Sequence, residues 1–497
     1  MQLPNVHRHF RWVIIVFVAS FLSIEANYGQ ATEANLLGRW SQDSLPGSFN
    51  HNNVYNEIWG YARDGHEFAI IGTTAGTHFI EVTDPTQPEE VAFVPGRVQG
   101  GAIIHRDFHD YRGFLYAASG EGSQSTLQVI DMRQLPDTVT VVYDERDLSS
   151  TSHNIFIDTV TARLYSLTAR GGNVPYAPLR IFDIQDPAQP KLLSSHDRFG
   201  NIRPSHVHDA FVLDDIAFLN LGFDGLVIAD FRNPDQPDIL STVTEYPARG
   251  YNHSGWISSD CSTYYFGDEN HGFDLKTLNI SNLCEPEIVG TFDAEVDNPN
   301  SITHNQVVAG DHLYVSYYYD GLRVYDISDP FRPTLTEFYD TYDEPDGTAY
   351  RGAWGVYPFL PSGTILVSDM QSGLFVFEGP TDASQRTAAD PACLRQQLCQ
   401  TTSVEEPLAT TAIYLVTNPV RRQFQLQMPG QPLGRSASLM LYSTAGQPVA
   451  NWALPTRGVP SETLTFDLPT ELVGGVYWLV VPHTTSMESI PLVVLPD

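Results

Sequence analysis

The sequence has few cationic side chains. Of its 497 residues, 27 are Lys or Arg against 59 Asp or Glu, and the formal net charge is −32. Binding to nucleic acids without sequence preference requires a basic surface that neutralises phosphates, so this composition argues against DNA or RNA as a partner. The acidity is typical of a soluble extracellular protein, and it is compatible with Ca²⁺ sites without indicating any.

Motifs of nucleotide binding and of nucleophilic catalysis are also missing. No Gly-x-Ser-x-Gly, P-loop or dinucleotide fingerprint occurs in a context that supports it. This absence favours a binding or interaction module over an enzyme.

No segment after the first 30 residues is apolar enough to span a membrane. Residues 1–30 contain a basic stretch, the apolar run Trp12–Ala19 and small residues near Ala26–Ala31, which is the pattern of a secretory signal peptide. An N-terminal membrane anchor is the alternative, but the apolar run is short for a span of the bilayer. We therefore expect an exported protein without a transmembrane helix once the signal peptide is cleaved.

Cysteine is scarce, with four residues in the whole chain. An exported protein can form disulfides, so the four are expected to pair. Cys261 and Cys284 fall in two turns expected at the same end of a four-stranded meander, which makes a bridge between them reasonable. Cys393 and Cys399 would close a small loop further along the chain. Free buried thiols are the alternative.

A run of the form apolar-apolar-x-Asp-x-x-Asp-Pro-x-x-Pro recurs about seven times. Its equivalent positions, 47 to 52 residues apart, are Asp84, Asp131, Asp183, Asp230, Asn279, Asp326 and Glu378. A near-constant period in this range indicates a repeat architecture. The Asp of each run is expected to cap a turn.

Each repeat has the pattern of four short strands. In the sixth, residues 301–333, alternating apolar runs are separated by turn residues. Four strands in about 49 residues fit a β-propeller blade better than a solenoid coil of about 20–30 residues. We therefore predict an all-β fold with a seven-bladed β-propeller over residues 36–380. Leu36–Trp40 resembles a fourth strand with no repeat before it, and should complete the seventh blade and close the ring.

The C-terminal region has a different pattern. Residues 381–411 are rich in Thr, Ala, Gln and Pro and indicate a linker. Strand-like runs over residues 412–497 are sized for a small Ig-like β-sandwich. This region also resembles the C-terminal sorting domain of type IX secretion, in Asn418-Pro419-Val420, Leu441–Gln447 and Leu472–Trp478. The resemblance implies export by the type IX secretion machinery and attachment to the cell surface, and an ordinary Ig-like accessory module is the alternative.

One histidine recurs at the start of the first strand of five repeats. Aligning the repeats on their second strands places together His105, His153, His208, His253 and His304, with Trp59 and Trp354 in repeats one and seven. Because the first strand of a blade is the innermost, these side chains should encircle one mouth of the central channel. A loop with Asp268, Glu269 and His271 should open on the same face. The candidate ligand-binding residues are therefore Trp59, His105, His153, His208, His253, Asp268, Glu269, His304 and Trp354.

Two interpretations of these histidines stay open. Converging imidazoles can hold a divalent metal with an open position, and the candidate ligands are His105, His153, His208, His253 and His304. A nearby carboxylate would complete the metal shell or act as a general base. Alternatively, each imidazole bonds the backbone of the next blade and is structural, because a residue present in every repeat suits a structural role.

Several stretches of the chain resemble the choice-of-anchor B family of LVIVP-repeat propellers. They lie within residues 36–380 and are Tyr55–Gly60, Ile71–Thr77, Ser152–Ile155, Tyr251–Trp256, Asp268-Glu269 and Gly352–Pro358. The resemblance implies a surface-displayed propeller, and the family has no settled activity to carry over. We therefore predict a secreted, cell-surface binding module for an unknown extracellular ligand. Its rivals are a metal-dependent hydrolase, lyase or oxidoreductase that uses the histidines, and a purely structural surface-layer component.

Overall fold

The computed structural model describes residues 31–42, 44–171 and 176–398 and, towards the C-terminus, residues 414–415, 420–428, 438–443, 447–453, 462–470, 472–482 and 487–495. The chain divides into two compact units, Met1–Cys399 and Gln400–Asp497. The expected signal peptide, residues 1–30, lies outside the described residues. Within the part of the chain that is described, no helix has the length and apolar character needed to cross a bilayer.

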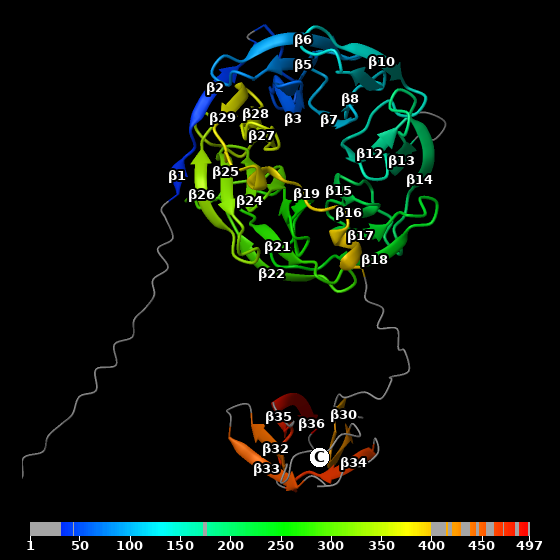
Figure 1. Cartoon of the computed structure of the whole chain (residues 1–497), viewed down its shortest axis with the longest axis vertical. Coiled ribbons are helices and arrows are strands. Elements are labelled where there is room, and N and C mark those ends of the chain that lie inside the picture. The colour runs from blue at the N-terminus through cyan, green and yellow to red at the C-terminus, as the bar shows by residue number, and fades with distance from the viewer. Residues whose placement is uncertain are drawn as a thin grey trace, which may run out of the picture. The chain divides into compact units, whose positions relative to one another are not determined.

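Seven antiparallel sheets are found among the described residues of the first unit, and they stand in a ring (Figure 1). The innermost strands are β3 (Tyr55–Arg63), β7 (Arg106–Tyr111), β11 (Ile155–Asp158), β15 (Asp209–Leu213), β19 (Asn252–Ile257), β23 (Gln306–Ala309) and β27 (Ala353–Tyr357). The second strands are β4 (His66–Thr73), β8 (Phe114–Ser119), β12 (Arg163–Arg170), β16 (Ile216–Asn220), β20 (Thr263–Asp268), β24 (His312–Tyr317) and β28 (Ile365–Asp369).

The outer half of each sheet is formed by two further strands. The third strands are β5 (Gly76–Glu81), β9 (Leu127–Asp131), β13 (Tyr176–Asp183), β17 (Leu226–Asp230), β21 (Leu275–Asn279), β25 (Gly321–Asp326) and β29 (Gly373–Phe377). The outermost strands are β6 (Glu89–Pro95), β10 (Thr140–Glu145), β14 (Lys191–His196), β18 (Asp238–Val243), β22 (Glu287–Phe292), β26 (Thr334–Tyr339) and β2 (Leu36–Trp40).

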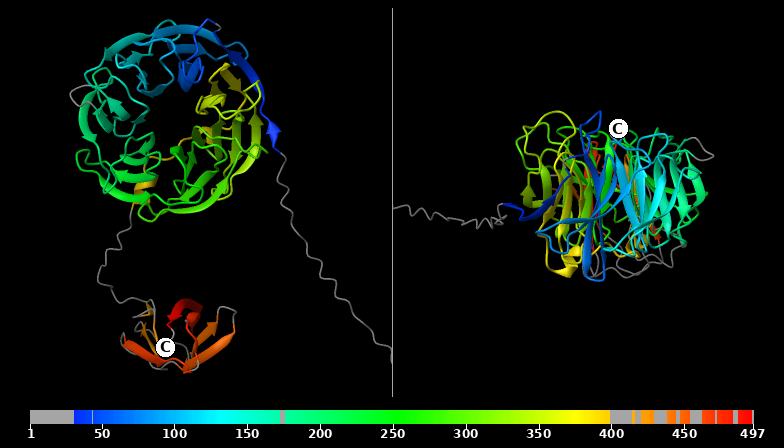
Figure 2. Two further views of the ribbon diagram at one scale, coloured as in Figure 1. Left: turned by 180° about the vertical axis from the view of Figure 1, so that it is seen from behind. Right: turned by 90° about the horizontal axis from the view of Figure 1, so that it is seen from above.

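The N-terminal strand closes the ring, as expected. β2 pairs antiparallel with β29 and completes the sheet of the last repeat. The innermost strands also contact one another in a closed cycle, in the order β3, β7, β11, β15, β19, β23, β27 and back to β3. Figure 2 shows this ring from behind and edge-on. One more strand, β1 (Thr32–Glu33), pairs in parallel with β26 at the outer rim.

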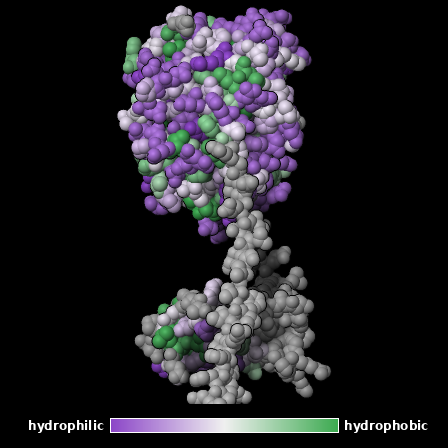
Figure 3. All heavy atoms as spheres, turned by 90° about the vertical axis from the view of Figure 1, so that its left-hand side faces the viewer, coloured by the Kyte–Doolittle hydropathy of each residue, from purple (hydrophilic) through white to green (hydrophobic). Residues whose placement is uncertain are grey.

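The burial of the strands follows their residue types. Second and third strands are mostly buried, and β16 and β17 are buried along their whole length. Outermost strands are more exposed, and in β22 exposed and half-buried side chains alternate, which is the pattern of a strand with one face in water. The core therefore lies between neighbouring sheets. The outer surface over β1, β2 and β26 is largely hydrophilic (Figure 3).

The Asp of the repeated run caps the turn between the third and fourth strands, as predicted. Its side chain accepts a hydrogen bond from the backbone N–H two residues later at Asp84, Asp131, Asp183, Asp230, Asn279 and Asp326. Such a bond replaces a missing backbone partner in a tight turn. The repeated Asp of the sequence therefore stabilises a turn of the fold and is not part of a binding site.

Residues 381–398, expected as the start of a linker, fold back onto the first unit. They contain the 3-10 helix η1 (Ala383–Arg386) and the short helix α1 (Cys393–Gln396). Leu394 is buried in the core, and the N–H of Leu283 donates to the carbonyl of Gln397 at 2.9 Å. This segment is therefore part of the first unit.

The disulfide pairing expected from the sequence is wrong. Cys261, in the turn between β19 and β20, is bonded to Cys393, which lies 132 positions further along the chain, and their Cα atoms are 5.9 Å apart. Neither Cys261–Cys284 nor Cys393–Cys399 can form beside this bridge. The expectation failed because it treated each segment alone, whereas residues 381–398 return to the sheet of the fifth repeat. Cys284 is also disulfide-bonded, and Cys399 lies outside the described residues.

The second unit has two sheets among its described residues. One has the order β30 (Tyr414–Leu415), β31 (Gln423–Met428), β34 (Glu462–Asp467), and the other β33 (Pro448–Ala453), β32 (Ser438–Ser443), β35 (Gly475–Pro482), β36 (Met487–Val494). Apolar side chains of both sheets share one core, which includes Phe424, Leu441 and Leu479. Of the sorting-domain stretches, Asn418-Pro419 and residues 444–446 lie outside the described residues.

Candidate functional site

Five imidazoles and one indole form a closed circuit at one end of the innermost strands. Successive ring centroids are 4.1–5.5 Å apart around His105, His153, His208, His253, His304 and Trp354. We call these six residues the histidine circuit. The structure thus brings the five predicted histidines into contact with one another.

Trp59 lies apart from the histidine circuit, and it is therefore not beside Trp354, which belongs to the circuit. The Trp59 ring is 4.2 Å from that of His109 and 5.0 Å from that of Tyr357, further along the innermost strands. The cause is the alignment of repeat one, in which Trp59-Gly60 is matched to Trp354-Gly355. Trp59 instead corresponds to Tyr357, three residues after Trp354, and Glu57 is the residue of β3 that reaches the cavity of the circuit.

A polar layer lies one step along the strands from the circuit. It surrounds a small cavity of about 70 Å³ and consists of Glu57, Asp107, Asn154, Asp209 and Asn305. Burial raises the pKa of Glu57 to about 7, with the charge of Asp209 adding to the shift, and raises the pKa of Asp209 to about 6. Burial and the charge of Glu57 also raise the pKa of Asp107. Carboxyls of this layer therefore hold protons near neutral pH.

The sequence analysis missed the polar layer. Its signal is an acidic or amide side chain one or two residues after the histidine of a repeat, as in His105-Arg106-Asp107 and His208-Asp209. These positions line the smaller cavity that lies next along the innermost strands. Two members of the polar layer are joined by a hydrogen bond, in which Asn305 Nδ2 donates to Glu57 Oε2 at 2.9 Å.

An aromatic layer fills the channel beyond the polar layer. Neighbouring rings are 4.2–5.8 Å apart among Trp59, His109, Phe156, Phe211, Trp256 and Tyr357. Burial lowers the pKa of His109 to about 3, so its imidazole is neutral and packs like an aromatic ring. Circuit, polar layer and aromatic layer follow one another along the innermost strands.

The histidine circuit lines a cavity of about 290 Å³, which we call the histidine cavity. Its wall also includes His51, Glu57, Ile104, Glu121, Asn154, Glu269, Tyr318 and Tyr350. Burial raises the pKa of Glu269 to about 7, and the Tyr318 hydroxyl donates to Glu269 Oε1 at 2.6 Å. Burial likewise raises the pKa of Glu121. The cavity thus combines imidazole nitrogens, carboxyls and hydroxyls on one rigid frame.

Of the three predicted loop residues, Glu269 lines the histidine cavity. Asp268 points to the other side, where its Oδ2 lies 2.6 Å from Lys276 Nζ and both side chains are fully buried. The alternation of strand side chains explains why these two neighbours separate, because β20 ends at Asp268. His271 is bonded through both ring nitrogens to backbone carbonyls.

The imidazoles of the histidine circuit are neutral at pH 7. Burial lowers the pKa of His304 to about 3 and that of His153 to about 4. Burial, with neighbouring imidazoles adding to it, holds the pKa well below the usual range at His105, His208 and His253. A neutral imidazole carries one N–H and one lone pair, so its contacts fix which nitrogen is free.

Backbone carbonyls assign the protons of two of these rings. His208 Nδ1 lies 3.2 Å from the carbonyl oxygen of His253, and His304 Nδ1 lies 2.6 Å from that of Trp354. A carbonyl accepts, so both Nδ1 atoms donate and both Nε2 atoms carry the lone pair. His208 Nε2 then accepts from His153 Nε2 at 2.8 Å. At His208 and His304 the bonds reach the next repeat, as the structural interpretation expects.

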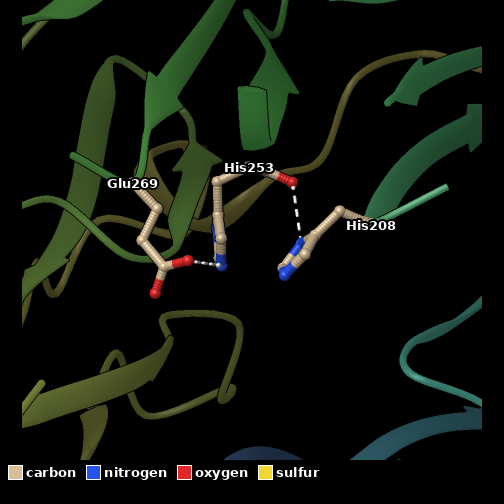
Figure 4. Close-up of side chains that lie close together, drawn as sticks. All are labelled: His208, His253 and Glu269. Atoms are coloured by element: carbon tan, nitrogen blue, oxygen red, sulfur yellow. Dashed lines mark hydrogen bonds and ion pairs between the residues drawn. The ribbon is translucent and has the colours of Figure 1, made fainter. Parts of the chain in front are cut away.

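One group in the histidine cavity has the spacing of metal ligands. Ligand atoms of His208, His253 and Glu269 lie within 4.8 Å of one another, with 3.8 Å between His253 Nε2 and Glu269 Oε2. Figure 4 shows the three side chains facing one space. Among the residues that the structure describes, this group is narrower than the predicted set, because it leaves out His105, His153 and His304.

Comparison with known proteins supports the repeat. Residues 303–341 match the LVIVD repeat family, and no curated protein matches the chain. Among solved structures, the β-propeller domain of Cps50 (Swd1) from Myceliophteria thermophila is 12% identical with a TM-score of 0.44, and the match covers 65% of this chain and 96% of that one. The WD40 repeats of RRP9 are 9% identical with a TM-score of 0.46, and the match covers 68% and 99%. The all-β chain thus has β-propellers among its structural neighbours.

Proposed function

We propose that the chain is a seven-bladed β-propeller that acts as a binding module, with the histidine cavity as its ligand site. The observation that carries this proposal is the cavity of about 290 Å³ walled by six contacting aromatic rings and by Glu269 and Glu121. Its size is near the lower end of about 300–1,000 Å³ for small-molecule sites, and its few polar groups converge on one space. The ligand is therefore a small polar molecule or the tip of a larger one.

Neutral imidazoles and protonatable carboxyls determine which ligands fit. Each can offer a donor or an acceptor, and the tyrosine hydroxyls add both kinds. A ligand with hydroxyl, amide or carboxyl groups, such as a sugar or a peptide end, can satisfy these groups. A purely apolar ligand would leave them without partners, which costs about 1–3 kcal/mol for each.

We further propose that the module is displayed at the cell surface. Residues 1–30 act as the signal peptide, residues 36–380 form the propeller, and residues 412–497 form an Ig-like sorting domain read by the type IX secretion machinery. The choice-of-anchor B resemblance and the LVIVD repeat support this assignment. Two sheets around one core in the second unit are compatible with an Ig-like sandwich.

A cavity-filling variant tests the ligand site. A Cβ at Gly120 would lie 3.4 Å from His105 Nδ1 and 3.6 Å from His153 Nδ1, so a larger side chain there would press on two rings that line the cavity, and no backbone atom is among its nearest neighbours. The matched control is Gly290, on the outer strand β22, whose Cβ would meet one atom, a backbone oxygen at 3.8 Å.

The assay is a calorimetric titration of the full chain with a panel of saccharides, peptides, amino acids and organic acids. We expect a ligand of the wild type to lose at least about 10-fold in affinity with Gly120→Leu, equal to about 1.4 kcal/mol. Gly290→Leu should bind like the wild type. Full binding by Gly120→Leu would place the ligand elsewhere and refute the proposal.

A metal-dependent hydrolase, lyase or oxidoreductase is the second candidate. The group of His208, His253 and Glu269 favours it, because two imidazoles and a carboxylate can hold a metal with an open position. Turnover of ester, phosphoester or glycoside probes by zinc-loaded protein, lost on metal removal, would support an enzyme over a binding module.

A further inference from the structure

We propose that His208, His253 and Glu269 bind one divalent first-row transition metal ion, represented by Zn²⁺, whose open position faces the histidine cavity. This inference deepens the proposed function. It rests on that function in one respect, namely that a ligand entering the histidine cavity would coordinate the bound ion through a lone pair. The metal site itself stands on the contacts of the three side chains.

The spacing of the three ligand atoms is close to that of a filled site. Tetrahedral Zn²⁺ with bonds of about 2.0–2.1 Å places its ligand atoms about 3.3 Å apart. His253 Nε2 and Glu269 Oε2 are 3.8 Å apart, and the three ligand atoms all lie within 4.8 Å of one another. Side-chain movements of about 1 Å would therefore bring the three atoms into a common shell. Glu269 is the more exposed of this pair, at 17% against 2% for His253.

The other ring nitrogen of each histidine is already held by the protein. His208 Nδ1 donates to the carbonyl of His253 at 3.2 Å, which leaves its Nε2 with the lone pair. His253 Nδ1 lies 3.0 Å from Ser254 Oγ. Because that hydroxyl donates to the carbonyl of His304 at 2.7 Å, it accepts from His253 and leaves Nε2 free. Metal-binding histidines have this same arrangement, with the second nitrogen donating to protein oxygen.

The carboxylate is oriented in the same way. The Tyr318 hydroxyl donates to Glu269 Oε1 at 2.6 Å, and Oε2 faces His253. A ligand carboxylate that is hydrogen-bonded through its other oxygen is the usual arrangement at metal sites. Glu269 is thus positioned to give one oxygen to an ion.

The competing account is a metal-free cluster held by hydrogen bonds. In it, His153 Nε2 donates to His208 Nε2 at 2.8 Å and occupies the lone pair that a metal would use. Metal binding must break that bond, so the two accounts exclude each other at His208. Metal content and affinity therefore decide between them.

The test is elemental analysis of the purified full chain, followed by titration of the chelator-treated protein with Zn²⁺ and with Co²⁺, whose visible absorption reports four-coordinate binding. We expect about one ion per chain and at least about 10-fold weaker binding for Glu269→Gln, which keeps an oxygen for Tyr318. His253→Gln is the second variant, in case Glu269→Gln does not fold by circular dichroism. The matched control is His66→Gln, which breaks a histidine–carboxylate pair outside the cavity, 2.7 Å from Glu81.

Two outcomes would overturn the inference. One is a wild-type chain that neither contains nor takes up a transition metal. The other is metal binding that Glu269→Gln and His253→Gln leave unchanged, since the ion would then bind elsewhere. The proposed function is tested separately. If metal-free protein binds a ligand of the panel and Gly120→Leu abolishes this, the binding module holds without the metal, whereas full binding by Gly120→Leu refutes the ligand site and leaves the metal site standing.

Discussion

Replacing Glu57 by Gln should stabilise the protein above neutral pH and have little effect in acid. Glu57 is 7% exposed and lies in the polar layer with Asp107 and Asp209, where burial raises its pKa to about 7 from an ordinary value of 4.5. Because the folded-state pKa is the higher one, the native protein holds the proton more tightly than the unfolded chain. The stability that this group contributes is complete below pH 4.5 and is lost as pH rises to 7.

The size of the effect follows from the two pKa values. Above pH 7 the cost of ionising Glu57 in the folded state is about 3 kcal/mol, because one pKa unit equals about 1.4 kcal/mol. At pH 5 the same cost is below about 1 kcal/mol, since most of the shift lies at higher pH. Glutamine keeps an acceptor for the Asn305 amide and carries no charge. The unfolding free energy of Glu57→Gln should therefore exceed that of the wild type mainly at high pH.

Denaturant unfolding of wild type and Glu57→Gln at pH 5 and pH 8 measures this difference. We expect the gain in unfolding free energy to be larger at pH 8 by about 2–3 kcal/mol. Glu89→Gln, on the exposed start of β6, is the matched control for removal of a carboxylate from the surface. An equal effect of Glu57→Gln at both pH values would refute the reasoning, because it would mean that Glu57 ionises as it does in the unfolded chain.

Three further outcomes are expected. Lys276→Met should cost about 3–5 kcal/mol, because it leaves the buried carboxylate of Asp268 uncompensated, and the double variant Lys276→Met/Asp268→Asn should recover part of this in thermal unfolding. Deletion of Leu36–Trp40 should lower the melting temperature of the first unit, because β29 loses its outer partner, and an unchanged melting curve would count against the closure. Removal of residues 412–497 should leave a folded propeller in the periplasm, and its normal appearance outside the cell in fractionation would reject the sorting assignment.

Much of the fold could be predicted because the chain repeats itself. The run ending in Asp-Pro marks the same turn in each repeat, and alternating apolar residues before it mark the strands. Leu36–Trp40 had the pattern of a fourth strand without a repeat of its own, and the last repeat lacked a fourth strand, so the two were expected to pair. These inferences need only local residue patterns, which a single sequence contains, and the general rule that the edges of sheets tend to be paired.

The site could be predicted in part, and the errors have physical causes. Five histidines share one register, but the Trp-Gly pair common to Trp59 and Trp354 suggested a false equivalence, and Trp59 lies in the aromatic layer beside Tyr357. Asp268 and Glu269 are neighbours in sequence and point to opposite sides, so one forms a buried ion pair and the other lines the cavity. The Cys261–Cys393 bridge depends on where residues 381–398 return, which is a long-range contact without a local signal.

The most direct test of the ligand site is nitrogen-15 NMR of protein labelled at its 16 histidines. On addition of a ligand from the panel, we expect shifts at the imidazoles of His105, His153, His208, His253 and His304, assigned by single His→Gln variants. The imidazoles of His66, His196 and His312, which do not line the histidine cavity, should stay unchanged. Shifts confined to those three while the ligand is bound would contradict the account.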